Sequence, residues 1–336
     1  MKKTTTLILG LLAVTFGGAL SVQPAAAKTK AKEPTEKKAF TAQERATIKG
    51  YRQQLKGISN STKGMYVQKP SLKKSFKPGK LSQKYINATV KSVNFYRQMY
   101  GLNTIEANPQ WNEDAQYGAA TLAAADEGLA HELTGIKRPG YVSKTAWNRG
   151  VDATGYSNIG EGVVKPYDNV LNYLVDSGQS DYVPGHREWL LGNTIEIGVG
   201  QAGIYNDLKV FEGGAKCRAF DPKDGLAKEV AYPKAGVFPI NAVKGSVWSL
   251  SYSIGTGEKA SKPVVKVTDN TTHKKVKVTH VTNYNSATGY GWFKTSISYQ
   301  PTLSKVKANH AYTVKISGLG NHADVNYQTK LFKLSK

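Results

Sequence analysis

Three glycines, a His-Glu pair and one cysteine are spaced in ways that resemble cofactor or catalytic motifs. Gly198, Gly200 and Gly203 form a literal G-x-G-x-x-G, but a dinucleotide site requires a helix directly after that motif. Residues 204–210 predict a turn and another strand instead, so we do not expect a nucleotide site. His131-Glu132 lacks the second histidine, four positions on, that a zincin helix requires. The sequence has no G-x-S-x-G elbow, and Cys217 has no neighbouring histidine in sequence, so nucleophilic catalysis has no clear support.

Both helices and strands are predicted to position such residues. Residues 41–58 begin with a capping-box spacing of Thr41 and Glu44 and continue with apolar residues at helical intervals. Residues 59–80 are rich in Ser, Lys, Gly and Pro, and predict a linker. Helices are predicted over 86–100, from Asn108-Pro109 to near Gly128, and over 168–176, and strands over 194–201 and 208–212. Helices first and strands later indicate an α+β fold.

The pattern changes from about residue 240. Short runs of alternating polar and apolar residues are separated by turn signals at Asp269-Asn270, Asn285-Ser286 and Gly318–Gly320. Six or seven short strands over such a length predict a small β-sandwich. Without a Cys–Trp–Cys framework, the sandwich would be immunoglobulin-like only in a loose sense.

Four segments of the middle region together resemble one known family. They are Asn94-Phe95-Tyr96-Arg97 with Gly101-Leu102; Asn108-Pro109-Gln110-Trp111 with Ala115-Gln116; Asn158-Ile159-Gly160-Glu161; and Pro184-Gly185-His186-Arg187 with Leu190-Leu191 and Glu196-Ile197-Gly198-Val199-Gly200. This combination resembles the CAP superfamily (cysteine-rich secretory protein, antigen 5 and pathogenesis-related proteins), in its bacterial SCP-like extracellular form. The resemblance implies an α-β-α sandwich. We therefore divide the chain into a signal peptide (1–27), a basic extension with one helix and a linker (28–80), a CAP domain (81–239) and a β-sandwich (240–336).

The resemblance also implies a ligand-binding cleft. His131 matches the first histidine of the family, Glu161 the loop carboxylate and His186 the second histidine. Asp176 stands where some members have a second acid, if Tyr173 aligns with their tryptophan. Gly162 replaces the asparagine that usually follows the loop acid, and the disulfides of animal and plant members are absent.

Such a set of side chains allows three interpretations. Two neutral imidazoles and a carboxylate would bind Zn²⁺ or another divalent metal and leave a coordination position open. The same groups without metal would hold a water molecule and move protons. A hydrogen-bonded cluster that only connects two helices and a loop is the structural alternative.

The first 27 residues have the layout of a secretory signal peptide. Lys2 and Lys3 precede an apolar run from Leu7 to Leu20, and Ala25-Ala26-Ala27 offers a small-residue cleavage site. The run is shorter than the roughly 20 residues that span a bilayer, so we expect cleavage and no transmembrane anchor afterwards. One cysteine cannot form an intramolecular disulfide. These features predict a secreted, extracellular bacterial protein.

Charge is distributed unevenly along the chain. Residues 28–80 contain 15 Lys/Arg and 3 Asp/Glu, a net charge of +12; residues 81–239 contain 15 and 18, a net charge of −3; residues 240–336 contain 14 and 3, a net charge of +11. Basic flanks outside a bacterial cell would meet anionic wall polymers or other acidic surfaces, although charge also serves solubility alone. No recognition motif accompanies the lysines, so we expect no specific nucleic-acid binding.

We therefore expect a CAP protein whose cleft binds a ligand or metal and whose basic flanks adhere to the cell wall. A metal-assisted hydrolase of peptide, ester or phosphodiester bonds is the alternative that the same cleft allows. The CAP family is known more for binding and signalling than for catalysis, which favours the binding protein.

Overall fold

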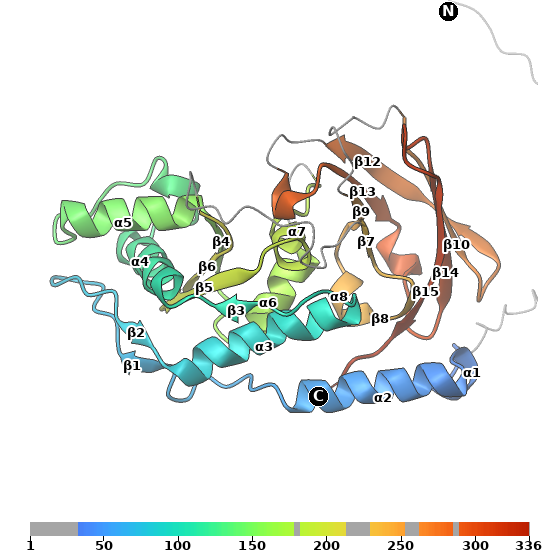
Figure 1. Ribbon diagram of the computed structural model, residues 1–336, viewed down its shortest axis with the longest axis horizontal. Helices are drawn as coiled ribbons and strands as arrows, with labels where there is room; N and C mark the ends of the chain where they lie inside the picture. Colours follow the sequence, from blue (N-terminus) through green and yellow to red (C-terminus); the bar gives the residue numbers. More distant parts are fainter. Residues whose placement is uncertain (1–32, 178–181, 213–228, 253–261, 285–288, 336) are drawn as a thin grey trace, which may run out of the picture. The chain divides into compact units, whose positions relative to one another are not determined.

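The computed structural model describes residues 33–177, 182–212, 229–252, 262–284 and 289–335 (Figure 1). From Pro34 onward the chain forms one compact unit. The predicted signal peptide and Cys217 lie outside the described residues. Within the described ranges, no helix combines the length and hydropathy that a membrane crossing requires.

A four-stranded sheet lies at the centre of the CAP-like region, in the order β3-β5-β6-β4. Its strands are β3 (Glu106–Ala107), β4 (Ser157–Glu161), β5 (Glu196–Ala202) and β6 (Tyr205–Lys209). β4, β6 and β5 are antiparallel neighbours, and β3 pairs with β5 in parallel. The two predicted strands, 194–201 and 208–212, correspond to β5 and β6 with shifted ends.

Helices cover both faces of this sheet, as the resemblance implied (Figure 1). The helices are α3 (Gln83–Met99), α4 (Pro109–Ala125), α5 (Lys144–Gly155), α6 (Pro166–Val175) and α7 (Gly185–Leu191). α4 and α5 lie on one face, and α3, α6 and α7 on the other. α4 begins as predicted, with the Asn108 side chain accepting from the backbone N–H groups of Gln110 and Trp111 and with proline at the first helical position.

The glycines of the apparent nucleotide motif serve packing. Gly198 and Gly200 lie in β5, where a Cβ atom would collide with the α4 backbone at Trp111 and Ala115. Gly203 has a φ of +57° in the turn that joins β5 to β6. No helix follows, as predicted, because the motif lies in an antiparallel hairpin that lets α4 approach the sheet closely.

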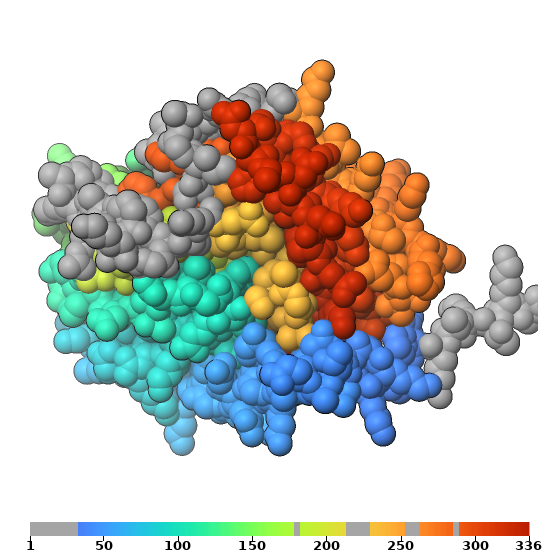
Figure 2. All heavy atoms as spheres, turned by 45° about the vertical axis from the view of Figure 1, so that its right-hand side comes forward, coloured from blue at the N-terminus to red at the C-terminus, as the bar shows by residue number. Residues whose placement is uncertain are grey.

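The N-terminal extension is part of this unit. It contains α1 (Glu36–Ala39) and α2 (Ala42–Lys56), and the predicted capping box of Thr41 and Glu44 is present. Tyr51 of α2 stacks on Phe332 near the C-terminus and packs edge-on against Phe95 of α3. In Figure 2 the blue extension correspondingly lies along both the α3 region and the C-terminal strands.

Residues 59–80 do not form the linker that their composition predicted. They contain β1 (Tyr66–Gln68), paired with β2 (Lys80–Leu81), and both Leu72 and Phe76 pack against the alanines of α4. Gln116 of α4 also donates to the Pro78 carbonyl at 2.7 Å. Two apolar side chains among many polar ones are enough to hold this segment, because α4 offers a surface of small residues.

The C-terminal region forms two sheets, in the orders β11-β10-β14-β15-β8 and β12-β13-β9-β7. The strands are β7 (Glu229–Tyr232), β8 (Gly236–Pro239), β9 (Trp248–Tyr252), β10 (Val264–Asp269), β11 (Lys274–Val276), β12 (Val278–Tyr284), β13 (Thr295–Pro301), β14 (Ala311–Ser317) and β15 (Val325–Phe332). The short helical segments α8 (Ile240–Val243), η3 (Tyr290–Trp292) and η4 (Leu303–Lys305) lie between strands. Trp248 of β9 packs edge-on against Tyr312 of β14, which connects the two sheets.

These sheets begin before residue 240. β7 pairs with β9, and β8 pairs in parallel with β15, so residues 229–239 belong structurally with the C-terminal strands. The alternating strand pattern is recognisable in the sequence only from about residue 240. Before that point β7 and β8 are short, and a Pro-Lys-Ala-Gly turn lies between them. The parallel β8–β15 pair also departs from a purely antiparallel sandwich.

Candidate functional site

His186 and Asp176 form the closest pair among the predicted cleft residues. Asp176 ends α6 in a left-handed conformation, and His186 lies in the first turn of α7. The His186 Nδ1 lies 2.8 Å from Asp176 Oδ1, with the histidine side chain 22% exposed and the carboxylate 1% exposed. The other oxygen, Oδ2, accepts from the Arg187 backbone N–H at 3.3 Å. A buried carboxylate thus holds a partly exposed imidazole.

The surroundings of this pair fix the ring in place. Tyr173 lies against it, with ring centroids 5.3 Å apart. The Tyr173 hydroxyl donates to the Asn158 carbonyl at 2.9 Å, and the Asn158 amide donates to the His186 carbonyl at 3.0 Å. A carboxylate that accepts from Nδ1–H keeps the neutral ring in one tautomer, with Nε2 as the ring's acceptor. Chemically, the pair suits an oriented acceptor or base.

His131 lies beside the end of α5, on a different element from Asp176 and His186. It belongs to η1 (His131–Leu133), and its Nδ1 lies 2.7 Å from the Thr154 carbonyl at the end of α5. Because a carbonyl can only accept, Nδ1 donates there. Leu133 of the same turn packs with Ile159 of β4 and Tyr205 of β6. His131 itself is exposed.

Glu161 is the last residue of β4 and is exposed. It pairs in register with Tyr205, whose hydroxyl donates to Asp126 Oδ1 at 3.0 Å. Burial, with smaller contributions from Asp126 and Glu161, raises the pKa of the Tyr205 hydroxyl. The Glu161 carboxylate is therefore close enough to the Tyr205 hydroxyl to influence it electrostatically.

Across the described residues, no three His, Cys, Asp or Glu side chains gather where they could hold one ion. We therefore derive no catalytic step through a metal. The metal site stays a prediction from the resemblance.

The two residues after His186 have a role that the sequence reading missed. The Arg187 guanidinium is buried and donates to the Ser246 hydroxyl at 2.7 Å and to the Val247 carbonyl at 3.1 Å. It also lies 3.9 Å from the centre of the Tyr232 ring. These partners belong to the C-terminal sheets and their connections, so α7 inserts a cation into the sandwich. The Pro-Gly-His-Arg match contained this residue but gave no sign of its partner.

Glu188 enters the same interface. It is buried, and its Oε1 accepts from the hydroxyls of Ser251 at 2.6 Å and Tyr284 at 2.5 Å. Burial raises the pKa of Glu188 to about 7, and these hydrogen bonds only partly oppose that rise. A second buried acid, Asp207, faces Gly118 of α4, and burial raises its pKa to about 8. Both carboxyl groups favour the protonated form inside the fold.

Comparison with known proteins agrees with the geometry of the middle region. The family model described as CAP, the cysteine-rich secretory protein family, matches residues 90–211. The matched segment contains the four predicted cleft residues, His131, Glu161, Asp176 and His186. No curated protein and no solved structure matches the chain.

Replacing His186 should destabilise the protein far more than replacing His131. His186→Ala removes a hydrogen bond to the buried Asp176 carboxylate, which costs about 3 kcal/mol of unfolding free energy. His131→Ala removes an exposed ring with one backbone contact, which costs about 1 kcal/mol or less. Urea unfolding followed by tryptophan fluorescence measures both. Equal losses for the two variants would contradict the assignment of Asp176 to His186.

Glu188→Gln should change how stability depends on pH. An acid whose pKa rises from 4.5 to about 7 on folding binds more protons in the folded state. Its contribution is therefore greatest below pH 4.5 and falls by about 3 kcal/mol as the pH rises to 7. The uncharged glutamine removes that fall. Urea unfolding of both proteins from pH 4.5 to 8 should give a difference that grows in favour of the variant, and a constant difference would refute the buried-acid account.

Proposed function

We propose that this chain, whose residues 90–211 match the CAP family, is a secreted bacterial binding protein that adheres to anionic wall polymers. The CAP domain presents the His186–Asp176 pair to a ligand, and basic surfaces of the flanking segments hold the protein at the wall. One arrangement of lysines on the C-terminal sheet carries the proposal.

The outer face of the five-stranded sheet presents lysines from three adjacent strands. Lys266 of β10 pairs in register with Lys315 of β14, and Lys275 of β11 pairs with Thr268 of β10. All three lysines are exposed, whereas Val267, Val276 and Val314 next to them in sequence are buried. Strand alternation therefore directs the three ammonium groups to the same solvent-facing side.

This arrangement costs stability unless an anion is present. Like charges directly opposite each other on neighbouring strands are destabilising. No ion pair of Lys266, Lys275 or Lys315 occurs among the described residues; the nearby Lys330 of β15, by contrast, is paired with Glu44 of α2 at 2.8 Å. A polymer with phosphate or carboxylate groups along its length would supply the missing counter-charge at several points.

The N-terminal extension adds to the basic surface. Lys73, Lys74, Lys77 and Lys80 are exposed in the segment that packs against α4. Because packing fixes this segment, its lysines keep a defined position relative to the CAP domain. Lysines of both flanks, whose net charges are +12 and +11, thus lie on surfaces that packing holds in place.

A binding role requires of the cleft only what the described residues provide. The His186–Asp176 pair supplies one oriented imidazole. An oriented imidazole suffices to hydrogen-bond a polar ligand group.

The triple substitution Lys266→Gln/Lys275→Gln/Lys315→Gln should weaken wall binding. We expect the variant to elute from isolated teichoic-acid-containing walls at a clearly lower NaCl concentration, because fewer counterions are released on binding. Its thermal stability should stay equal or rise slightly, since the cross-strand repulsion is gone. Sedimentation with washed walls over a salt series measures the first effect, and calorimetry the second.

Lys84→Gln/Lys91→Gln/Lys144→Gln is the matched control, because it removes the same charge from exposed positions of the CAP helices. Its elution should change much less. Equal shifts for the two triple variants would show that only net charge matters, and failure of salt to elute the native protein would exclude electrostatic retention.

A further inference from the structure

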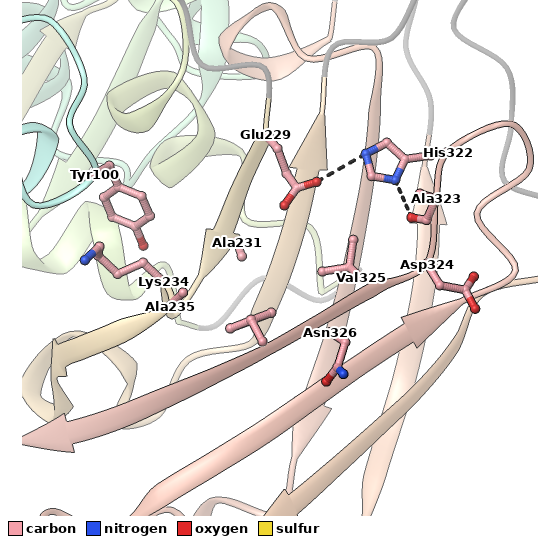
Figure 3. A pocket seen from close by; sticks show the side chains of 11 residues that line it. Tyr100, Glu229, Ala231, Lys234, Ala235, His322, Ala323, Asp324, Val325 and Asn326 are labelled. Atoms are coloured by element: carbon pink, nitrogen blue, oxygen red, sulfur yellow. Dashed lines mark hydrogen bonds and ion pairs between the residues drawn. The ribbon is translucent and has the colours of Figure 1, made fainter.

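A cavity of about 630 Å³ lies between the end of α3 and the edge of the C-terminal sandwich. Its walls come from Tyr100 after α3, from β7, from the turn between β7 and β8, and from residues 322–327 at the start of β15 (Figure 3). This volume lies in the range of small-molecule sites in proteins. None of the predicted cleft residues lines it, so it is separate from the His186–Asp176 pair.

One side of the cavity carries a cation. Lys234 lies in the turn after β7, and burial alone lowers the pKa of its ammonium group. In the described part of the chain no carboxylate pairs with it. The buried hydroxyl of Tyr100 lies beside the Lys234 backbone. A partly desolvated ammonium with a neighbouring hydroxyl is a site for a carboxylate group.

The other side carries acids. Glu229 Oε2 lies 3.2 Å from Nε2 of His322, and the Nδ1 of the same ring lies 2.7 Å from the Ala323 carbonyl. A ring that donates from Nδ1 to the carbonyl and from Nε2 to the carboxylate carries a positive charge, so Glu229 has one ion-pair partner and keeps its other oxygen for a ligand. Asp324 adds a second carboxylate at the exposed rim. Figure 3 shows Lys234 with Tyr100 on one side, Glu229 with His322 on the other, and Ala231 between them.

The cavity is therefore dipolar. A simple anion would meet repulsion from Asp324, and a simple cation would meet repulsion from Lys234 and His322. A ligand with a carboxylate at one end and an ammonium at the other satisfies both sides at once. The side chains of Ala231, Ala235 and Val325 supply apolar wall area for a small body between the two charges.

We propose that this cavity binds a small zwitterion of the amino-acid or short-peptide class, with the ligand carboxylate on Lys234 and the ligand ammonium on Glu229. The protein recognises the ligand by the separation between its two charged groups and by the small apolar body between them. It does not involve the lysines of the outer sheet face, and it stands or falls independently of wall adhesion.

The test is calorimetric titration of the purified protein with alanyl-leucine and its two singly blocked forms. The free dipeptide should bind, and N-acetylation or C-terminal amidation should each weaken binding about tenfold or more. Because these comparisons use the unaltered protein, they do not depend on any variant folding. No binding of the free dipeptide, or equal binding of all three compounds, overturns the proposal.

Two variants test which side chain binds the ligand carboxylate and which binds the ligand ammonium group. Lys234→Met should bind the dipeptide and its amide equally, and Glu229→Gln should bind the dipeptide and its N-acetyl form equally. Lys244→Met, an exposed lysine outside the cavity, is the control and should keep the native discrimination. If Lys234→Met still prefers the free carboxylate about tenfold, the carboxylate binds elsewhere and the proposed orientation is wrong.

Discussion

The burial of one guanidinium group determines how the rest of this molecule is assembled. Arg187 projects from α7 of the CAP-like region, and its partners in the sandwich are the hydroxyls of Ser246 and Ser249, the Val247 carbonyl and the Tyr232 ring. A buried charge needs hydrogen-bond partners, and although Nε has none, the partners of the two terminal nitrogens favour one docking orientation of the sandwich. The neighbouring Glu188 adds a second polar contact to the same interface. His186 precedes both, and the docking therefore also fixes the imidazole that faces Asp176.

The N-terminal extension reinforces this assembly from another side. α2 contacts α3 through Tyr51 and Phe95, and it contacts the last strand through Phe332 and the Glu44–Lys330 ion pair. The extension thus bridges the two regions that α7 joins. The basic flanks are thereby held against the nearly neutral CAP-like region. Their lysines consequently form surfaces of defined shape. The dipolar cavity arises at the same junction, where Tyr100 of the CAP region meets β7 and β15.

The sequence predicted correctly those features that depend on neighbouring residues, such as the starts of helices. The Thr41–Glu44 capping box and the Asn108-Pro109 helix start lie where expected, because each depends on residues within one turn. The CAP resemblance predicted the α-β-α fold and the neighbourhood of His186 and Asp176. Patterning did not predict α5, whose buried residues are small ones such as Gly150 and Ala153, nor the packing of 59–80, which depends on the distant surface of α4. The hydrogen-bond partners of Arg187 could not be predicted from the sequence. They are hydroxyls and carbonyls far along the chain, and no residue pattern near the arginine indicates them.

α7 and the N-terminal extension make the CAP-like region and the sandwich one cooperative unit. Native-state hydrogen exchange tests this cooperativity most directly, by comparing slowly exchanging amides of α4 with those of β14. We predict the same opening free energy for both, equal to that of global unfolding, and a parallel decrease for both in Arg187→Met. A sandwich that opens at a lower free energy while α4 stays protected would contradict the account.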